Sequence, residues 1–268
     1  MSTKNTATDK TKSNNTVLVI PARYASTRLP GKPLRLIAGK PMIQHVYERA
    51  QAAAEALGFQ SIIIATDDQR IQTSCEAFGA EVCMTSTTHE TGSDRLAEVV
   101  KIKQWADDTI VVNLQGDEPL TPIESLRQVA ENLENNPEAT MSTLSTPIQT
   151  EAEYKDPNVV KVVTDKQGLA MYFSRAPIPF QRDSHKDDAV QIIAYAQRHI
   201  GIYAYRASYL TSFAKMEECQ VEQLEKLEQL RAMWFGARIH VAEANEVPGH
   251  GVDTEEDLIA VEKILKGK

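Results

Sequence analysis

The chain has 268 residues, of which 42% are hydrophobic and 25% charged, a composition typical of a soluble globular protein with one large core or two modest ones. Its formal net charge of -8 argues against broad binding of nucleic acid and against contact with an anionic membrane surface. No apolar run approaches the ~20 residues needed to cross a bilayer, and three scattered cysteines are too few for a disulfide framework or a zinc site, so a reducing cytoplasm fits best.

Residues 1–15 are rich in Thr, Lys, Asn and Ser and contain no apolar segment of the kind found in signal peptides. Such a composition cannot build a core, so we expect a disordered tail here. We expect one domain over residues 16–268.

A basic loop follows the first apolar run, residues 17–20, which is typical of a buried strand. Arg23, Arg28 and Lys32 supply three cations within residues 21–34. Many α/β proteins bind a phosphate chain with such a loop at the carboxyl edge of the sheet. The spacing matches neither the P-loop nor GxGxxG, which disfavours P-loop NTPases and dinucleotide dehydrogenases. A plain surface loop closed by Pro-Gly is the alternative.

Alternating helical and apolar segments follow the basic loop. Short apolar runs without polar alternation are typical of a parallel sheet that is covered on both faces. The pattern therefore predicts an α/β fold with a doubly wound, mostly parallel sheet, whose loops after each strand meet at one ligand-binding edge. The predicted segments are a helix at 41–56, a strand at 61–65, a helix at 69–78 and a strand at 81–84.

The loop at 89–95 precedes a predicted helix at 96–105. Gly92 and Ser93 offer backbone and hydroxyl groups near the helix start, and Arg95 offers a planar fork of donors. These residues leave two interpretations open. Ser93 can be a simple N-cap beside a surface Arg95, or the three can contact a ligand.

The strongest chemical signal is Gln115-Gly116-Asp117-Glu118-Pro119, which ends a predicted buried strand at 109–114. It places a carboxylate at the carboxyl edge of the sheet, with Pro119 stopping the strand. A carboxylate beside a triphosphate is what Mg²⁺ requires. An Asx turn that caps the strand is the alternative.

The second half of the chain interrupts the α/β rhythm with an antiparallel pair at 159–163 and 168–175. Three polar residues here are candidates for ligand binding, and each also has an ordinary structural interpretation. Arg175 can be an exposed residue at a strand end, His199 can be a structural histidine, and Glu228 can belong to a solvated helix face. The other predicted segments are a helix at 122–135, a strand at 139–147, an exposed loop at 181–192, a strand at 199–206, one helix at 222–235, a strand at 239–242 and a terminal helix capped by Asp253 or Thr254.

Several of these segments resemble the sugar-activating cytidylyltransferases, most closely the branch that acts on 3-deoxy-manno-octulosonate (Kdo). The resemblance covers roughly residues 16–266 and is carried by Pro-Ala-Arg and Arg-Leu-Pro-Gly-Lys-Pro-Leu within 21–34, Gln-Gly-Asp-Glu-Pro, the segment from His199 to Arg206, Leu-Glu-Gln-Leu-Arg at 227–231 and Gly-Val-Asp-Thr within 251–254. It implies transfer of CMP from CTP to the sugar acid in lipopolysaccharide synthesis, with release of pyrophosphate, dependence on Mg²⁺ and a homodimer built by the antiparallel insertion.

The resemblance also implies site residues. Asp117 and Asp253 would bind one or two metal ions and act in catalysis with Lys32. The nucleotide would be bound by Arg23, Ser26, Arg28, Lys32, Gly92, Ser93, Arg95 and Gln115, and the sugar by Arg175, His199, Tyr203, Glu228 and Gln229.

Two other functions remain open from the sequence. One is a cytidylyltransferase for another sugar acid, such as the 8-amino analogue of Kdo or a sialic acid, which would differ around the sugar residues. The other is a non-catalytic nucleotide-binding module. The presence of both Asp117 and Asp253 disfavours the module, because a protein that only binds a nucleotide has little need for two metal-binding carboxylates.

Overall fold

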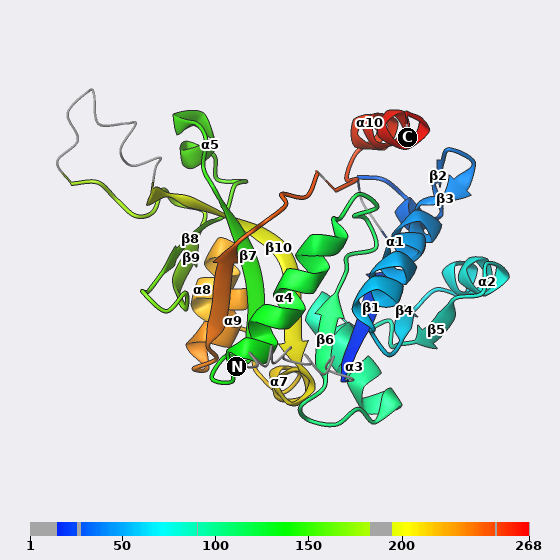
Figure 1. Cartoon of the computed structure of the whole chain (residues 1–268), viewed down its shortest axis with the longest axis horizontal. Helices are drawn as coiled ribbons and strands as arrows, with labels where there is room; N and C mark the ends of the chain where they lie inside the picture. The colour runs from blue at the N-terminus through cyan, green and yellow to red at the C-terminus, as the bar shows by residue number, and fades with distance from the viewer. Residues whose placement is uncertain (1–14, 26–27, 90, 183–194, 250, 268) are drawn as a thin grey trace, which may run out of the picture.

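The computed structural model describes residues 15–25, 28–89, 91–182, 195–249 and 251–267 (Figure 1). Ser26, residues 1–14 of the predicted tail and most of the loop predicted at 181–192 lie outside the described residues. No helix within the described part of the chain is both long and apolar enough to cross a membrane.

Within the described residues, nine strands form one sheet in the order β11-β7-β10-β6-β1-β4-β5, with β8 paired to β10 and β9 to β8. The pairs from β6 to β5 and the pair β11-β7 are parallel, whereas β10 runs antiparallel to β6, β7 and β8. The predicted mostly parallel sheet and its antiparallel pair are confirmed. The strands are β1 (Thr16–Ala22), β4 (Ile62–Thr66), β5 (Glu81–Met84), β6 (Ile110–Asn113), β7 (Met141–Pro147), β8 (Lys161–Thr164), β9 (Ala170–Ser174), β10 (Gln197–Arg206) and β11 (Ile239–Glu243).

Helices cover both faces of this sheet, as the unbroken apolar runs require. Along β1, Leu18 and Ile20 pack into the cluster with α1 and α4, while Val17 and Val19 face α3 and α7. In Figure 1, α1 and α4 lie side by side in front of the strands. The helices are α1 (Met42–Leu57), α2 (Gln69–Ala77), α3 (Gly92–Lys103), α4 (Ile123–Asn135), α5 (Glu151–Lys155), α7 (Ala207–Phe213), α8 (Gln220–Glu225), α9 (Gln229–Trp234) and α10 (Glu255–Lys266).

A small layer joins the two ends of the chain. The short helix η1 (Lys32–Leu34) leads into the hairpin of β2 (Leu36–Ile37) and β3 (Lys40–Pro41), and β2 packs against α10 through a cluster that includes Leu29, Ile37, Val252 and Leu258. Arg35 also pairs with Glu255 at 2.7 Å. The basic loop after β1 and the segment that bears Asp253 are thereby held next to each other, although more than 200 residues separate them.

Two predictions about local structure are wrong, and two short helices are missed. The helix predicted at 222–235 is two helices, because Lys226 adopts a left-handed conformation, with φ of 52°, that ends α8. Helix α3 begins at Gly92 and not at residue 96, since Thr91 and Asp94 form a capping box. Helices α5 and α7 were not predicted, because each is short and its register is decided by packing.

Candidate active site

A cavity of about 530 Å³ opens at the carboxyl ends of β1 and β6, where a doubly wound sheet is expected to bind its ligand. It brings together most of the predicted site residues, although they come from six separate parts of the chain. Those that line it are Arg23, Arg28, Lys32, Gly92, Ser93, Arg95, Gln115, Asp117, Tyr203, Glu228, Gln229 and Asp253. Arg175 and His199 are not among the lining residues.

Lys32 is the centre of the charged wall of this cavity. Its Nζ lies 2.6 Å from Asp117 Oδ2 and 3.1 Å from Asp253 Oδ1, and Arg28 Nη2 lies 3.1 Å from the other Asp253 oxygen. Burial by itself lowers the pKa of Lys32, but the attraction and hydrogen bonds of the two carboxylates outweigh it, so the pKa is raised above its usual value. The lysine is therefore a fixed cation at physiological pH.

Close packing of the backbone positions Asp117. A Cβ atom on Gly116 would lie 2.7 Å from the carbonyl oxygen of Pro21, so only glycine lets the loop after β6 pass this close to β1. Asp253 is placed differently. Thr254, and not Asp253, caps α10 through a capping box with Asp257, so the Asp253 side chain is available to Lys32 and Arg28.

The two aspartates fit a metal ion shared with a phosphate chain. Within the described residues, no group of three or more His, Cys, Asp or Glu side chains could hold a metal ion by itself. Asp117 and Asp253 nevertheless converge on one ammonium group at the cavity wall. Mg²⁺ is commonly bound by one or two carboxylates, with substrate phosphates and water completing its shell, so this donor set is suitable.

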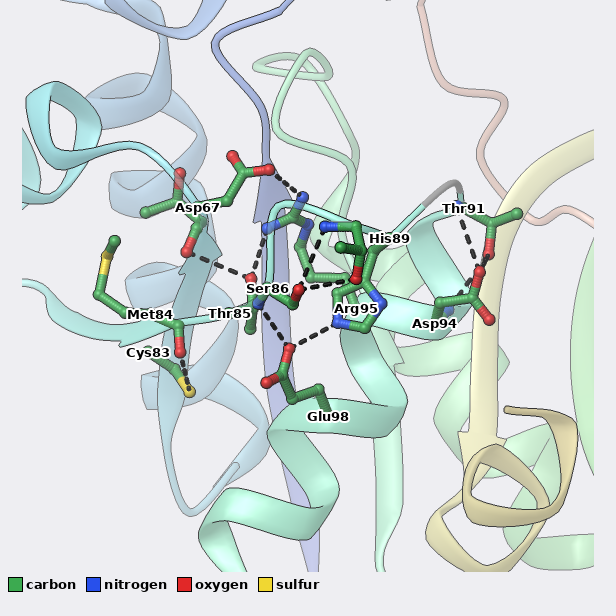
Figure 2. Close-up of polar contacts among 12 residues, drawn as sticks. Asp67, Cys83, Met84, Thr85, Ser86, His89, Thr91, Asp94, Arg95 and Glu98 are labelled. Carbon is green, nitrogen blue, oxygen red and sulfur yellow. Dashed lines mark hydrogen bonds and ion pairs between the residues drawn. The ribbon is translucent and has the colours of Figure 1, made fainter. Parts of the chain in front are cut away.

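Arg95 is buried, which excludes the interpretation of a surface arginine beside a Ser93 cap. The actual N-cap is Thr91, and Ser93 lies in the first turn of α3. Figure 2 shows the Arg95 guanidinium between the Asp67 carboxylate and the Thr85 hydroxyl, and its Nη2 is 2.8 Å from Asp67 Oδ2. Asp67 thus compensates the buried charge and holds the guanidinium in the wall of the cavity.

A row of aromatic rings from β10 and α7 also lines the cavity. Tyr203, Tyr205 and Tyr209 stack with centroid separations of 5.6 and 6.2 Å, and Phe213 follows at 5.8 Å. His199 lies behind Tyr203, at 5.3 Å between ring centroids. Burial lowers the pKa of His199 to about 3, so its ring is neutral at physiological pH.

Three polar atoms on this side of the cavity are buried without a hydrogen-bond partner in the described part of the chain. They are Asn113 Oδ1, the Tyr203 hydroxyl and Glu228 Oε1. Burial also raises the pKa of Glu228. Because unpartnered buried polar groups are costly and rare, these atoms indicate a polar ligand.

Arg175 lies apart from the cavity lining. Its Nε donates to the carbonyl oxygen of Glu225 at 2.6 Å and its Nη1 to that of Pro157 at 2.9 Å. Its role in sugar binding remains a prediction. Sequence reasoning missed Asn113, Tyr205 and Tyr209 as lining residues. An asparagine that ends an otherwise apolar strand was the one available signal for the first of them.

Comparisons with known proteins identify the family. Residues 17–239 match the family model described as Cytidylyltransferase. The 3-deoxy-manno-octulosonate cytidylyltransferase of Thioalkalivibrio sulfidiphilus is 55% identical over 249 residues, 93% of this chain and 98% of that protein. The protein of the same name from Vibrio vulnificus strain YJ016 is also 55% identical, over 94% of this chain and 98% of its own.

Solved structures show the same relationship. A CMP:2-keto-3-deoxy-manno-octonic acid synthetase complexed with CTP superposes with a TM-score of 0.83 and 43% identity, covering 94% of this chain and 98% of that one. A 4-diphosphocytidyl-2C-methyl-D-erythritol synthase, 14% identical with a TM-score of 0.61 over 94% of this chain and 98% of its own, shares the fold. The chain therefore belongs to the cytidylyltransferase family, among the 3-deoxy-manno-octulosonate cytidylyltransferases, and is a nucleotidyltransferase.

Proposed function

We propose that this protein transfers CMP from CTP to the anomeric hydroxyl of Kdo and releases pyrophosphate, as a step in lipopolysaccharide synthesis. The observation that carries the proposal is the convergence of Lys32, Asp117 and Asp253 on one wall of a cavity whose other wall is aromatic and contains unpartnered polar atoms. The names of the relatives and the CTP in the similar structure support the two substrates.

The charged wall suits the phosphate chemistry. Arg23, Arg28 and Lys32 bind the triphosphate and oppose the negative charge that develops on its oxygens during transfer. The sugar hydroxyl attacks the α-phosphorus in line, and the bond from this phosphorus to the pyrophosphate oxygen breaks. The nucleotide is also assigned to Gly92, Ser93, Arg95 and Gln115, and the sugar to Arg175, His199, Tyr203, Glu228 and Gln229.

Asp117 and Asp253 are proposed to hold Mg²⁺ together with phosphate oxygens of CTP. When bound, the ion supplies charge neutralisation and lowers the pKa of the attacking hydroxyl. The two carboxylates also pair with Lys32 and Arg28, which keeps both aspartates in place before the substrates arrive.

Pyrophosphate release from CTP and Mg²⁺, measured with and without Kdo, tests the function. Release that requires both the sugar and the metal is the expected result. Release with a sialic acid or 8-amino-Kdo, but not with Kdo, would show that the protein is a cytidylyltransferase for a different sugar acid. Tight CTP binding without release for any acid would contradict the proposal and favour the nucleotide-binding module.

The variant Asp117→Asn tests the assignment of the carboxylate. It removes the charge that holds the metal and keeps the shape, so kcat should fall by at least about 100-fold while the melting temperature is retained. Asp107→Asn is the matched control, because Asp107 is exposed and outside the cavity lining. A fully active Asp117→Asn protein would rule out this role.

A homodimer is proposed from an exposed apolar face formed by β9, α8 and α9. Met171 is 62% exposed, Leu224 82% and Trp234 62%, and large apolar side chains exposed on neighbouring elements often mark an interface. Glu225 of α8 accepts hydrogen bonds from the Ser174 hydroxyl and the Arg175 backbone N–H, and α9 packs against both α8 and β9. Light scattering of the wild type should give the molar mass of two chains. If the Leu224→Glu variant gives the molar mass of one chain, the interface includes this face.

A cytoplasmic location is proposed as well. Cys75, Cys83 and Cys219 are all free and buried, as expected of a protein kept in a reducing compartment. Fractionation of the native host, followed by detection of the protein, tests this location. Recovery in the periplasmic fraction would contradict it.

A further inference from the structure

Asn113 is a polar residue at a position where the surroundings call for an apolar one. It ends β6, and its side chain points to the same face as Val111, which packs in the core beneath α3 and α7. Only 3% of the residue is exposed. An asparagine buried in this way is expected to satisfy its amide group within the protein.

The amide oxygen of Asn113 has no such partner. Its Oδ1 is buried and unpaired in the described part of the chain, and the residue lines the cavity. The Asn113 side chain is hydrogen-bonded to Tyr205, a contact that opposes the larger effect of burial on the tyrosine pKa, but this contact leaves Oδ1 without a partner. Folding alone therefore does not explain the unpaired oxygen.

The neighbours of Asn113 indicate which kind of ligand group would pair with its Oδ1. In the antiparallel register of β6 and β10, Asn113 lies directly opposite Tyr203, whose hydroxyl is also unpartnered. Glu228, from the start of α9, supplies a third unpartnered atom in the same wall. An amide oxygen and a carboxyl oxygen accept hydrogen bonds, so the missing group is a donor, such as the hydroxyls of a polyhydroxylated ligand.

We propose that Asn113 is a specificity-determining residue, whose side-chain amide binds a hydroxyl of the acceptor sugar. The proposal rests on the proposed function, because it requires a sugar acid in this part of the cavity. It adds a contact from the central strand β6 to those assigned to β10 and α9. The strand is rigidly held between β1 and β10, so the amide is positioned before the sugar arrives.

The variant Asn113→Leu tests the proposal by separating stability from binding. Leucine has a similar size and removes the unpaired oxygen, and Tyr205 keeps its contact with Ser93, so the melting temperature of the free enzyme should stay about the same. Loss of one hydrogen bond should raise KM for Kdo about five- to tenfold, with KM for CTP unchanged. Asn113→Val, which suits a strand, gives the same readout if the leucine variant does not fold.

Asn132→Leu is the matched control. Its side-chain nitrogen is also buried and unpartnered, but it lies on α4, outside the cavity lining, so its substitution should leave both KM values unchanged. Wild-type turnover with Kdo in the same assay tests the proposed function separately. An unchanged KM for Kdo in the Asn113 variants, a rise confined to CTP, or a large loss of stability in both variants would each overturn the inference.

Discussion

The buried ion pair of Glu222 and Arg231 gives a prediction whose size follows from the structure. Arg231 Nε and Nη2 donate to the two Glu222 oxygens at 2.7 and 2.6 Å, and the side chains are 8% and 6% exposed for Glu222 and Arg231, respectively. The pair joins α8 to α9 across the break at Lys226, and Arg231 also stacks on Phe213 in the cavity wall. It therefore supports the turn that delivers Glu228 to the cavity.

Replacing Arg231 by Met keeps the apolar contact with Phe213 but leaves the Glu222 carboxylate buried without its partner. Breaking a buried pair in this way costs roughly 3–5 kcal/mol. The double variant Glu222→Leu with Arg231→Met buries no charge, so it should lie within about 1 kcal/mol of the wild type or above it. The free energy of unfolding from urea titrations measures both, with an unchanged m-value as the control for two-state behaviour.

The result that refutes this reasoning is specific. A single Arg231→Met variant that loses less than about 1 kcal/mol would show that Glu222 finds water or another partner. A double variant that is as unstable as the single one would show that packing, and not the stranded charge, causes the loss. In either case the ion pair would not be what holds the break between α8 and α9.

Two further predictions concern the cavity. Gly116→Ala should destabilise the protein by about 1–3 kcal/mol and abolish most activity, because the added Cβ would lie 2.7 Å from a backbone oxygen and displace Asp117. Gly201→Ala is the control, because a Cβ there has no atom within 4 Å. Equal melting temperatures for the two variants would contradict the prediction. The pKa of His199 is lowered to about 3 in the folded state against about 6.5 unfolded, so its contribution to stability is complete above pH 6.5 and is lost as pH falls. Between pH 7 and 5 the wild type should lose about 2 kcal/mol more than His199→Gln in urea titrations, and parallel pH curves would refute this.

The charged wall was predictable because its residues lie in short motifs whose chemistry is local. A basic loop after a strand and a carboxylate after a strand must meet when both strands are parallel neighbours, and β1 pairs with β6. The position of Asp253 could be predicted only from the family resemblance. Nothing in the local sequence shows that a residue at the start of the last helix lies at the same edge of the sheet as Asp117. The capping preference for Asp253 or Thr254 was resolved in favour of Thr254 only by the folded geometry.

The part of the cavity around the tyrosines was less predictable, because whether its residues line the cavity depends on segments distant in sequence. The spacing of Leu224, Leu227 and Leu230 predicts one helix, yet α8 ends at Glu225 and Lys226 turns the chain so that Glu228 and Gln229 face the cavity. Arg95 followed the same rule. The charge of Arg95 suggests a surface position. Its burial is possible because Asp67, the residue after β4, forms an ion pair with it.

By itself, the sequence determined the alternation of strands and helices, the covering of the sheet on both faces and the cations and carboxylates of the charged wall. These depend on periodicity and on motifs within a few residues, where the physical causes act between neighbours in the chain. Only the tertiary structure decided which polar atoms are paired, which helix is broken and where Arg175 lies relative to the cavity. Whether a polar group has a partner depends on segments distant in sequence, and so Asn113 could be singled out only after β6 and β10 had been placed side by side.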